Sequence, residues 1–153
     1  MKYKHILSRT YLACALLLAL FSFSSCSLDT DDSNELGQFW HLVSVDTLST
    51  GQSADVAAKR VFWSAQGVIF QVGDYSRIDG KRYVFHYEHQ DGTLRLYEPR
   101  LLDRSNGDPL VTDEAVLSPY GINNLETTFT IEALTGSKMV LSDSKVRLHF
   151  RAQ

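Results

Sequence analysis

Residues 79–97 read Asp79-Gly80-Lys81-Arg82-Tyr83-Val84-Phe85-His86-Tyr87-Glu88-His89-Gln90-Asp91-Gly92-Thr93-Leu94-Arg95-Leu96-Tyr97. Each Asp-Gly pair is a hairpin signal, because both residues tolerate the positive φ of tight β-turns. Between the pairs, Tyr83, Phe85 and Tyr87 would share one face of a strand, and Leu94 and Leu96 continue the alternation after the second pair. The segment therefore predicts antiparallel strands with one apolar face.

The same short, alternating pattern recurs on both sides of this segment. We expect strands at 36–46, 61–72, 81–89, 93–97, 125–133, 138–142 and 146–151. Seven strands become eight if Gly67 divides the long segment, since glycine inside a strand marks a bulge or sharp bend. Short strands joined by tight turns predict an all-β fold, a small antiparallel barrel or sandwich with one wet face.

Two stretches interrupt the strand pattern. Ser53 is placed to cap one short helix over 54–59, with Asp55 in its first turn. The connection 99–124 contains all three prolines, and Thr112 is placed to cap a helical turn over 113–117. A connection of this length in a small β domain is a lid or crossing loop, or is simply mobile.

The N-terminus has the layout of an export signal. Lys2, Lys4 and Arg9 precede an uncharged run over 11–23, which is long enough for a signal peptide but too short to span a membrane. Phe23-Ser24-Ser25-Cys26 then resembles a lipobox, although Phe23 stands where Leu is usual. The resemblance implies diacylglycerol on Cys26, and hence anchoring to membrane lipid. The alternative is an ordinary signal peptide with Cys26 incidental.

These features divide the chain into a signal peptide (1–25), an acidic flexible tether (26–35) and one domain (36–153). Acidic residues after the cysteine resemble the surface-export signal of some Gram-negative anaerobes, so we expect an outer-membrane lipoprotein that is surface-exposed or faces the periplasm. The printed charge is −3, and removal of three basic residues with the signal leaves −6. This acidity argues against nucleic acid as a partner.

The first expected strand begins Gly37-Gln38-Phe39-Trp40, which resembles the Gly-x-Trp opening of lipocalins with one residue added. In that family a late basic residue packs over the tryptophan, and Arg151, with Arg147 as the alternative, is placed to form such a barrel-closing pair with Trp40. With the strand layout and the lipobox, the chain resembles small lipocalin-like lipoproteins of gut-type anaerobes. The resemblance implies a lipocalin-like β-barrel of seven to eight strands that binds a small apolar or amphipathic ligand.

Aromatic and aliphatic residues offer a lining for such a ligand. The candidates are Trp63, Phe85, Tyr87, Leu96 and Phe129. The alternative is that they fill a solid core, since a barrel of eight strands is just wide enough for either. The second functional hypothesis is a non-enzymatic interaction module that docks on an outer-membrane or surface protein complex.

Catalytic and metal patterns are weak. On a strand, His86 and Glu88 share a face but His89 points the other way, so a metal would need His41 or His149 to arrive by folding. None of the serines lies in a Gly-x-Ser-x-Gly motif, and no two carboxylates have a sequence spacing that would make them a general acid and base. We therefore expect no enzyme, no metal and no cofactor.

Overall fold

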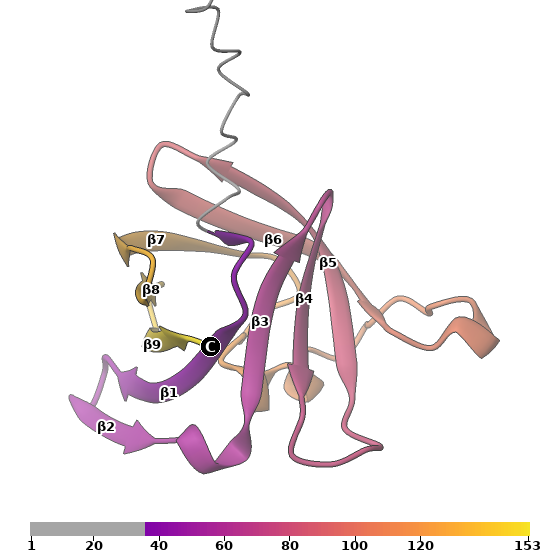
Figure 1. Cartoon of the computed structure of the whole chain (residues 1–153), viewed down its shortest axis with the longest axis horizontal. Coiled ribbons are helices and arrows are strands. Elements are labelled where there is room, and N and C mark those ends of the chain that lie inside the picture. The colour runs from indigo at the N-terminus through magenta and orange to yellow at the C-terminus, as the bar shows by residue number, and fades with distance from the viewer. Residues whose placement is uncertain (1–35) are drawn as a thin grey trace, which may run out of the picture. The chain divides into compact units, whose positions relative to one another are not determined.

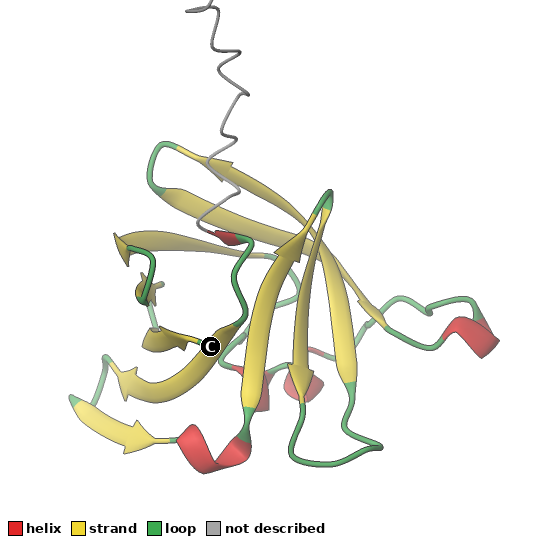
Figure 2. Ribbon diagram, viewed as in Figure 1, coloured by secondary structure: helices red, strands yellow, loops and turns green. Residues whose placement is uncertain are grey.

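We describe residues 36–153 of a computed structural model of the chain. The expected signal peptide, Cys26 and the tether lie outside these residues and stay predictions. Strands make up most of the described part, and short 3-10 helices interrupt its loops (Figure 2). Within residues 36–153, no helix combines the length and apolarity that a membrane crossing requires.

Nine strands form one antiparallel sheet that closes on itself (Figure 1). They are β1 (Trp40–Thr47), β2 (Gln52–Asp55), β3 (Val61–Gln66), β4 (Ile69–Asp74), β5 (Arg82–Gln90), β6 (Thr93–Leu101), β7 (Thr127–Leu134), β8 (Lys138–Ser142) and β9 (Val146–Ala152). Closure comes from β1, which pairs with β3 at one end and with β9 along its length. The predicted eight-stranded barrel is therefore confirmed, with β2 as an additional strand paired to β1.

Strand β2 was missed because all four of its residues, Gln-Ser-Ala-Asp, are exposed and have no apolar alternation. The expected helix over 54–59 shrinks to the 3-10 helix η2 (Ala57–Lys59), and Ser53 lies in β2 rather than at a cap. The first strand begins at Trp40 rather than Leu36. Val43 is an extra residue in β1, between the pairs Leu42–Phe150 and Ser44–His149.

The two Asp-Gly signals have different outcomes. Asp91 and Gly92 both have positive φ and form the tight turn between β5 and β6, as predicted. The β4–β5 hairpin also forms, but its loop runs from Tyr75 to Lys81, and Gly80 does not have a positive φ. A Cβ on Gly80 would lie 2.1 Å from the Asp74 carbonyl oxygen, so glycine here permits a close backbone approach. Gly67 divides the long segment and turns β3 into β4.

Alternate residues of each barrel strand point into one core, as the sequence pattern predicts. On β5 these are Tyr83 and Phe85, and on β6 Leu94 and Leu96. Strand β6 continues past the expected end at Tyr97, bulging at Glu98 (φ 51). Pro99 is accommodated at this bulge, where the register between β5 and β6 shifts.

The long connection between β6 and β7 is an ordered crossing loop with the 3-10 helices η3 (Arg104–Asn106), η4 (Glu114–Val116) and η5 (Ser118–Tyr120). Asp113, not Thr112, caps η4, because its side chain accepts a hydrogen bond from the amide of Ala115. The connection leaves the same end of the barrel as the loops that follow β1 and β4. We call this the loop end. The opposite end carries the tight turns after β3, β5 and β7.

Candidate functional site

The barrel interior is filled. Four of the five predicted lining residues are at most 1% exposed: Trp63, Phe85, Leu96 and Phe129. The indole of Trp63 packs against three rings, with centroid distances of 5.8 Å to Phe70 and Phe129 and 5.0 Å to Phe150. Edge and tilted contacts of this kind are the packing expected of a core. The structure therefore places these four in the solid-core alternative.

Tyr87, the fifth predicted lining residue, lies nearer the tight turns. Its side chain is partly buried and meets the Phe70 ring edge-on at 5.6 Å. Its hydroxyl donates a hydrogen bond to the carbonyl of Gly67, 3.0 Å away. Tyr87 thus ties β5 to the β3–β4 turn.

A short segment of the crossing loop closes the loop end. We call residues 117–122 the plug. Its side chains Leu117 and Ile122 are fully buried, and Tyr120 is 6% exposed. The Trp63 indole N–H donates to the Tyr120 carbonyl at 3.2 Å, which satisfies a polar group at the centre of the core.

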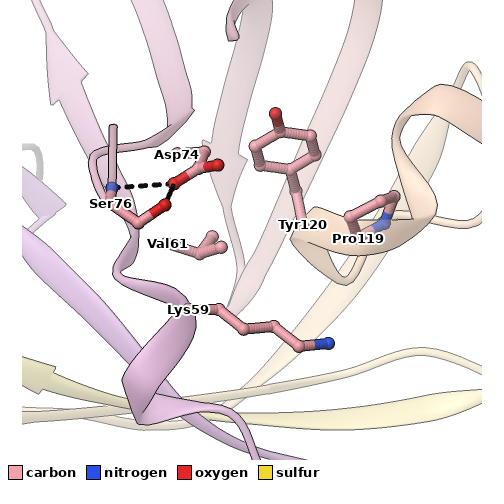
Figure 3. A pocket seen from close by; sticks show the side chains of 6 residues that line it. All are labelled: Lys59, Val61, Asp74, Ser76, Pro119 and Tyr120. Carbon is pink, nitrogen blue, oxygen red and sulfur yellow. Dashed lines mark hydrogen bonds between the residues drawn. The ribbon is translucent and has the colours of Figure 1, made fainter. Parts of the chain in front are cut away.

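A pocket of about 180 Å³ remains beside the plug, lined by Lys59, Val61, Asp74, Ser76, Pro119 and Tyr120 (Figure 3). Three parts of the chain supply it: the end of η2 with the start of β3, the end of β4, and η5. Val61 and Tyr120 are buried and give an apolar wall. In Figure 3, Lys59 lies across the pocket from Asp74 and Tyr120.

Hydrogen bonds keep Asp74 ionised. Its Oδ1 accepts from the Ser76 hydroxyl at 2.6 Å and from the Ser76 amide at 2.8 Å, and these bonds lower the pKa of the carboxyl below its ordinary value of 3.8. Burial, with a smaller contribution from Tyr83 and Asp74, raises the pKa of Tyr120 to about 12. Near neutral pH the pocket thus has an anionic carboxylate beside a neutral phenol.

Sequence reasoning did not find this pocket. Its residues are scattered over positions 59 to 120, and only folding brings η5 against β3 and β4. The one local signal is Asp74-Tyr75-Ser76, an Asx turn in which the aspartate bonds two residues ahead. That motif predicts a turn and carries no information on a ligand.

The predicted pair of Trp40 and Arg151 does not meet. Trp40 pairs across β1 and β9 with Ala152, while Arg151 pairs with His41. Trp40 is fully buried inside the barrel, and the Arg151 side chain is exposed on the outer surface. Among the described residues, the cations that stack on rings are Arg82 over Tyr75 and Arg95 over Tyr97.

The histidines weighed for a metal site are dispersed. Of these, His86 lies 3.8 Å from Glu98, and His149 Nε2 lies 2.8 Å from Asp46. Glu88 instead pairs with Arg95 at 2.9 Å. Residues 36–153 contain no group of three His, Cys, Asp or Glu side chains able to hold a metal ion.

The closed eight-stranded antiparallel barrel, filled inside and crossed by a long loop at one end, defines a lipocalin-like fold. Such a fold is typically used for binding rather than catalysis. The chain belongs to the lipocalin-like domain family, whose profile matches residues 19–152.

Two solved structures share this fold. A lipocalin-like protein from Bacteroides uniformis is 22% identical with a TM-score of 0.58, and the match covers 78% of this chain and 99% of that one. An uncharacterized protein from Bacteroides eggerthii is 20% identical with a TM-score of 0.58, over 77% and 99% of the two chains. Comparison with curated proteins gave no match.

Proposed function

We propose that this protein is a lipid-anchored binding protein of the outer membrane that takes a small apolar or amphipathic ligand at the loop end of its barrel. The observation that carries the proposal is the pocket beside the plug, which has an apolar wall and a charged group on either side. Ligand sites are commonly concave and mostly apolar, with a few placed polar groups. Because side chains fill the barrel interior, we expect the ligand in this pocket rather than at the barrel centre.

The pocket volume limits the size of the ligand. About 180 Å³ is less than the roughly 300–1,000 Å³ of sites for drug-sized molecules. A folded lipid chain would need the space that Trp63 and its neighbours occupy. We therefore expect a compact molecule with a short apolar body.

Tryptophan fluorescence of the full chain tests this proposal. The probe is 4-methyl-1-pentanol, a neutral amphipath of suitable size, and native mass spectrometry checks whether a molecule co-purifies. Because the Trp63 indole is bonded to the plug at Tyr120, we expect saturable changes in emission. Lys59→Phe, which fills the pocket from an exposed position, is expected to abolish them, whereas Lys138→Phe is the control at a distant exposed position. If neither this alcohol nor charged apolar probes of the same size bind saturably, and the chain purifies empty, the proposal is overturned.

Docking on a membrane-protein complex is the second candidate. It is favoured by a specific observation: Leu48, Ile78 and Leu110 are exposed on three loops of the loop end, at 40%, 104% and 53%. Exposed apolar side chains on loops can anchor a partner. Changing all three to serine should abolish recovery of a stoichiometric partner from membranes, while Lys59→Phe should leave it unchanged.

A further inference from the structure

Two side chains of opposite charge, Lys59 and Asp74, line the pocket, and Arg77 supplies only the smallest of the causes that lower the pKa of Asp74. None of the ion pairs among residues 36–153 includes Lys59 or Asp74. Lys59 ends η2 and is exposed, and Asp74 ends β4. Figure 3 shows them on opposite sides of the pocket, with Val61 between.

Asp74 is held in place before any ligand arrives. Both hydrogen bonds from Ser76 fall on Oδ1, and the structure gives Oδ2 no hydrogen bond from a described residue. The backbone beneath it is fixed as well, because the Asp74 amide donates to the Lys81 carbonyl at 3.1 Å. An acceptor that is already held in place lowers the entropic cost of binding, because the side chain need not be ordered when the ligand arrives.

Tyr120 is equally constrained. Its hydroxyl donates to the Lys81 carbonyl at 3.1 Å, and its ring meets Tyr83 edge-on at 5.3 Å. The hydroxyl is thus engaged away from the ligand, and the ring remains as a wall of the pocket. An aromatic ring beside a carboxylate favours an ammonium group, which both attract.

We propose that the ligand is a small zwitterion, with an ammonium group on Asp74 Oδ2, an anionic group towards Lys59 and a short branched apolar body on Val61, Pro119 and Tyr120. This inference rests on the proposed function and narrows it to a ligand class. Free α-amino acids with apolar side chains have this chemistry.

Other ligand classes fit the two charges less well. An anion alone would bind Lys59 but face the Asp74 carboxylate, and a cation alone would reverse the mismatch. A neutral apolar molecule would cover both charges without replacing their water, which is unfavourable. Only opposite charges on one molecule complement both sides.

A matched series of probes tests the inference on the full chain by calorimetry and tryptophan emission. Leucine is the zwitterion, 4-methylpentanoate has only the negative charge, 3-methylbutylamine only the positive charge, and 4-methyl-1-pentanol neither. Each exposed ion pair is worth up to about fivefold in affinity. Leucine should therefore bind up to about fivefold more tightly than either singly charged probe, and the difference from the neutral alcohol, which lacks both ion pairs, should be larger.

Two isosteric variants assign the charges. In Asp74→Asn the Oδ1 acceptor for Ser76 is kept, so leucine affinity should fall to that of 4-methylpentanoate. In Lys59→Met it should fall to that of 3-methylbutylamine. Asp91→Asn and Lys138→Met remove charges elsewhere and should leave leucine binding unchanged, and thermal denaturation verifies that every variant is folded.

The outcomes distinguish failure of the zwitterion proposal from failure of the proposed binding function. If leucine binds no better than the neutral alcohol, or keeps its affinity in both variants, the zwitterion is wrong while the binding function stands. If no member of the series binds, both are overturned.

Discussion

At the residue scale, the hydrogen bond between His149 and Asp46 makes the stability of the fold depend on pH in the acidic range. His149 and, to a smaller extent, Ser53 bond the Asp46 carboxylate and lower its pKa below the ordinary value of 3.8. A carboxyl whose pKa is depressed in the folded state stabilises the fold above the unfolded-state value, and this contribution is lost as pH falls through the folded-state value. The contact should therefore stabilise the barrel above about pH 4 and fail below it.

Urea denaturation of wild type and Asp46→Asn at pH 6 and between pH 4 and pH 2 measures this effect. The variant should be less stable than wild type at pH 6, and the difference should shrink as pH falls. His149→Gln should reproduce the loss at pH 6. Parallel stability curves for wild type and Asp46→Asn over this range would contradict the assignment.

The failure of the predicted Trp40–Arg151 contact also has its cause in the orientation of single residues. The alternation of β9 already places Val146, Leu148 and Phe150 on one face and Arg151 on the other. Since Trp40 points into the barrel, an outward arginine on a neighbouring strand cannot cover it. The family resemblance favoured the pair, but strand parity in this chain excludes it.

At the scale of elements, sequence predicted strands better than connections. All seven expected strand regions contain strands, because side-chain alternation records which face is buried. Asp79-Gly80 shows where the prediction of connections fails. It is the same dipeptide as Asp91-Gly92 but lies in a longer loop, where glycine is needed because the Asp74 backbone comes close to it. The pocket was beyond prediction because it forms where η5 meets β3 and β4, a contact that no local pattern encodes.

The plug depends on Gly121. Its φ is 86°, and an added Cβ would lie 2.8 Å from Leu148 Cδ2 in the core. Gly121→Ala should therefore combine left-handed strain with overpacking, a loss of about 2–5 kcal/mol in unfolding free energy. Gly107→Ala is the matched control: its φ is 73° but no atom lies within 4 Å, so only about 1–2 kcal/mol is expected. Equal losses in chemical denaturation would show that the Leu148 contact is unimportant.

An aromatic stack outside the barrel seals the short β1–β3 junction. Phe62 stacks on Phe39 and His41 at 4.5 Å, and Tyr75 meets both phenylalanines edge-on. Because β1 and β3 share only two residue pairs, these rings supply contacts that the backbone ladder lacks. Tyr75 and Arg82 both lie over Gly73, where an added Cβ would come within 2.6 Å of Arg82 Cγ and 2.9 Å of the Tyr75 ring.

Gly73→Ala should displace the Arg82 and Tyr75 side chains and reduce the free energy of unfolding by about 1–3 kcal/mol. The loss should be smaller when Tyr75 is already alanine, because the added methyl group then meets only the Arg82 side chain, whose Cγ lies 2.6 Å away. A double-mutant cycle in urea measures this coupling. Strict additivity of the two changes would mean that the ring does not respond to the added methyl group, and that the seam is held by other contacts.

At the scale of the whole molecule, barrel closure could be predicted but its contents could not. An eight-stranded barrel either encloses a cavity or is filled by its own side chains. Strand patterns are the same in both cases, since they report only which residues point inward. The large inward rings, with Trp63 at their centre, and the buried side chains of the plug decide for a filled barrel.

The predicted lipid anchor concerns the whole molecule, because it would hold the binding domain at a membrane. If Cys26 is acylated, two or three chains hold the protein firmly, at about 0.8 kcal/mol per buried methylene. Cys26→Ser should then release the protein from membranes during fractionation without changing probe affinity at the loop end. Cys14→Ser is the matched control, because that cysteine lies inside the apolar run and should not affect anchoring. A Cys26→Ser protein that still sediments with membranes would mean that another contact, such as docking through Leu48, Ile78 and Leu110, holds the protein there.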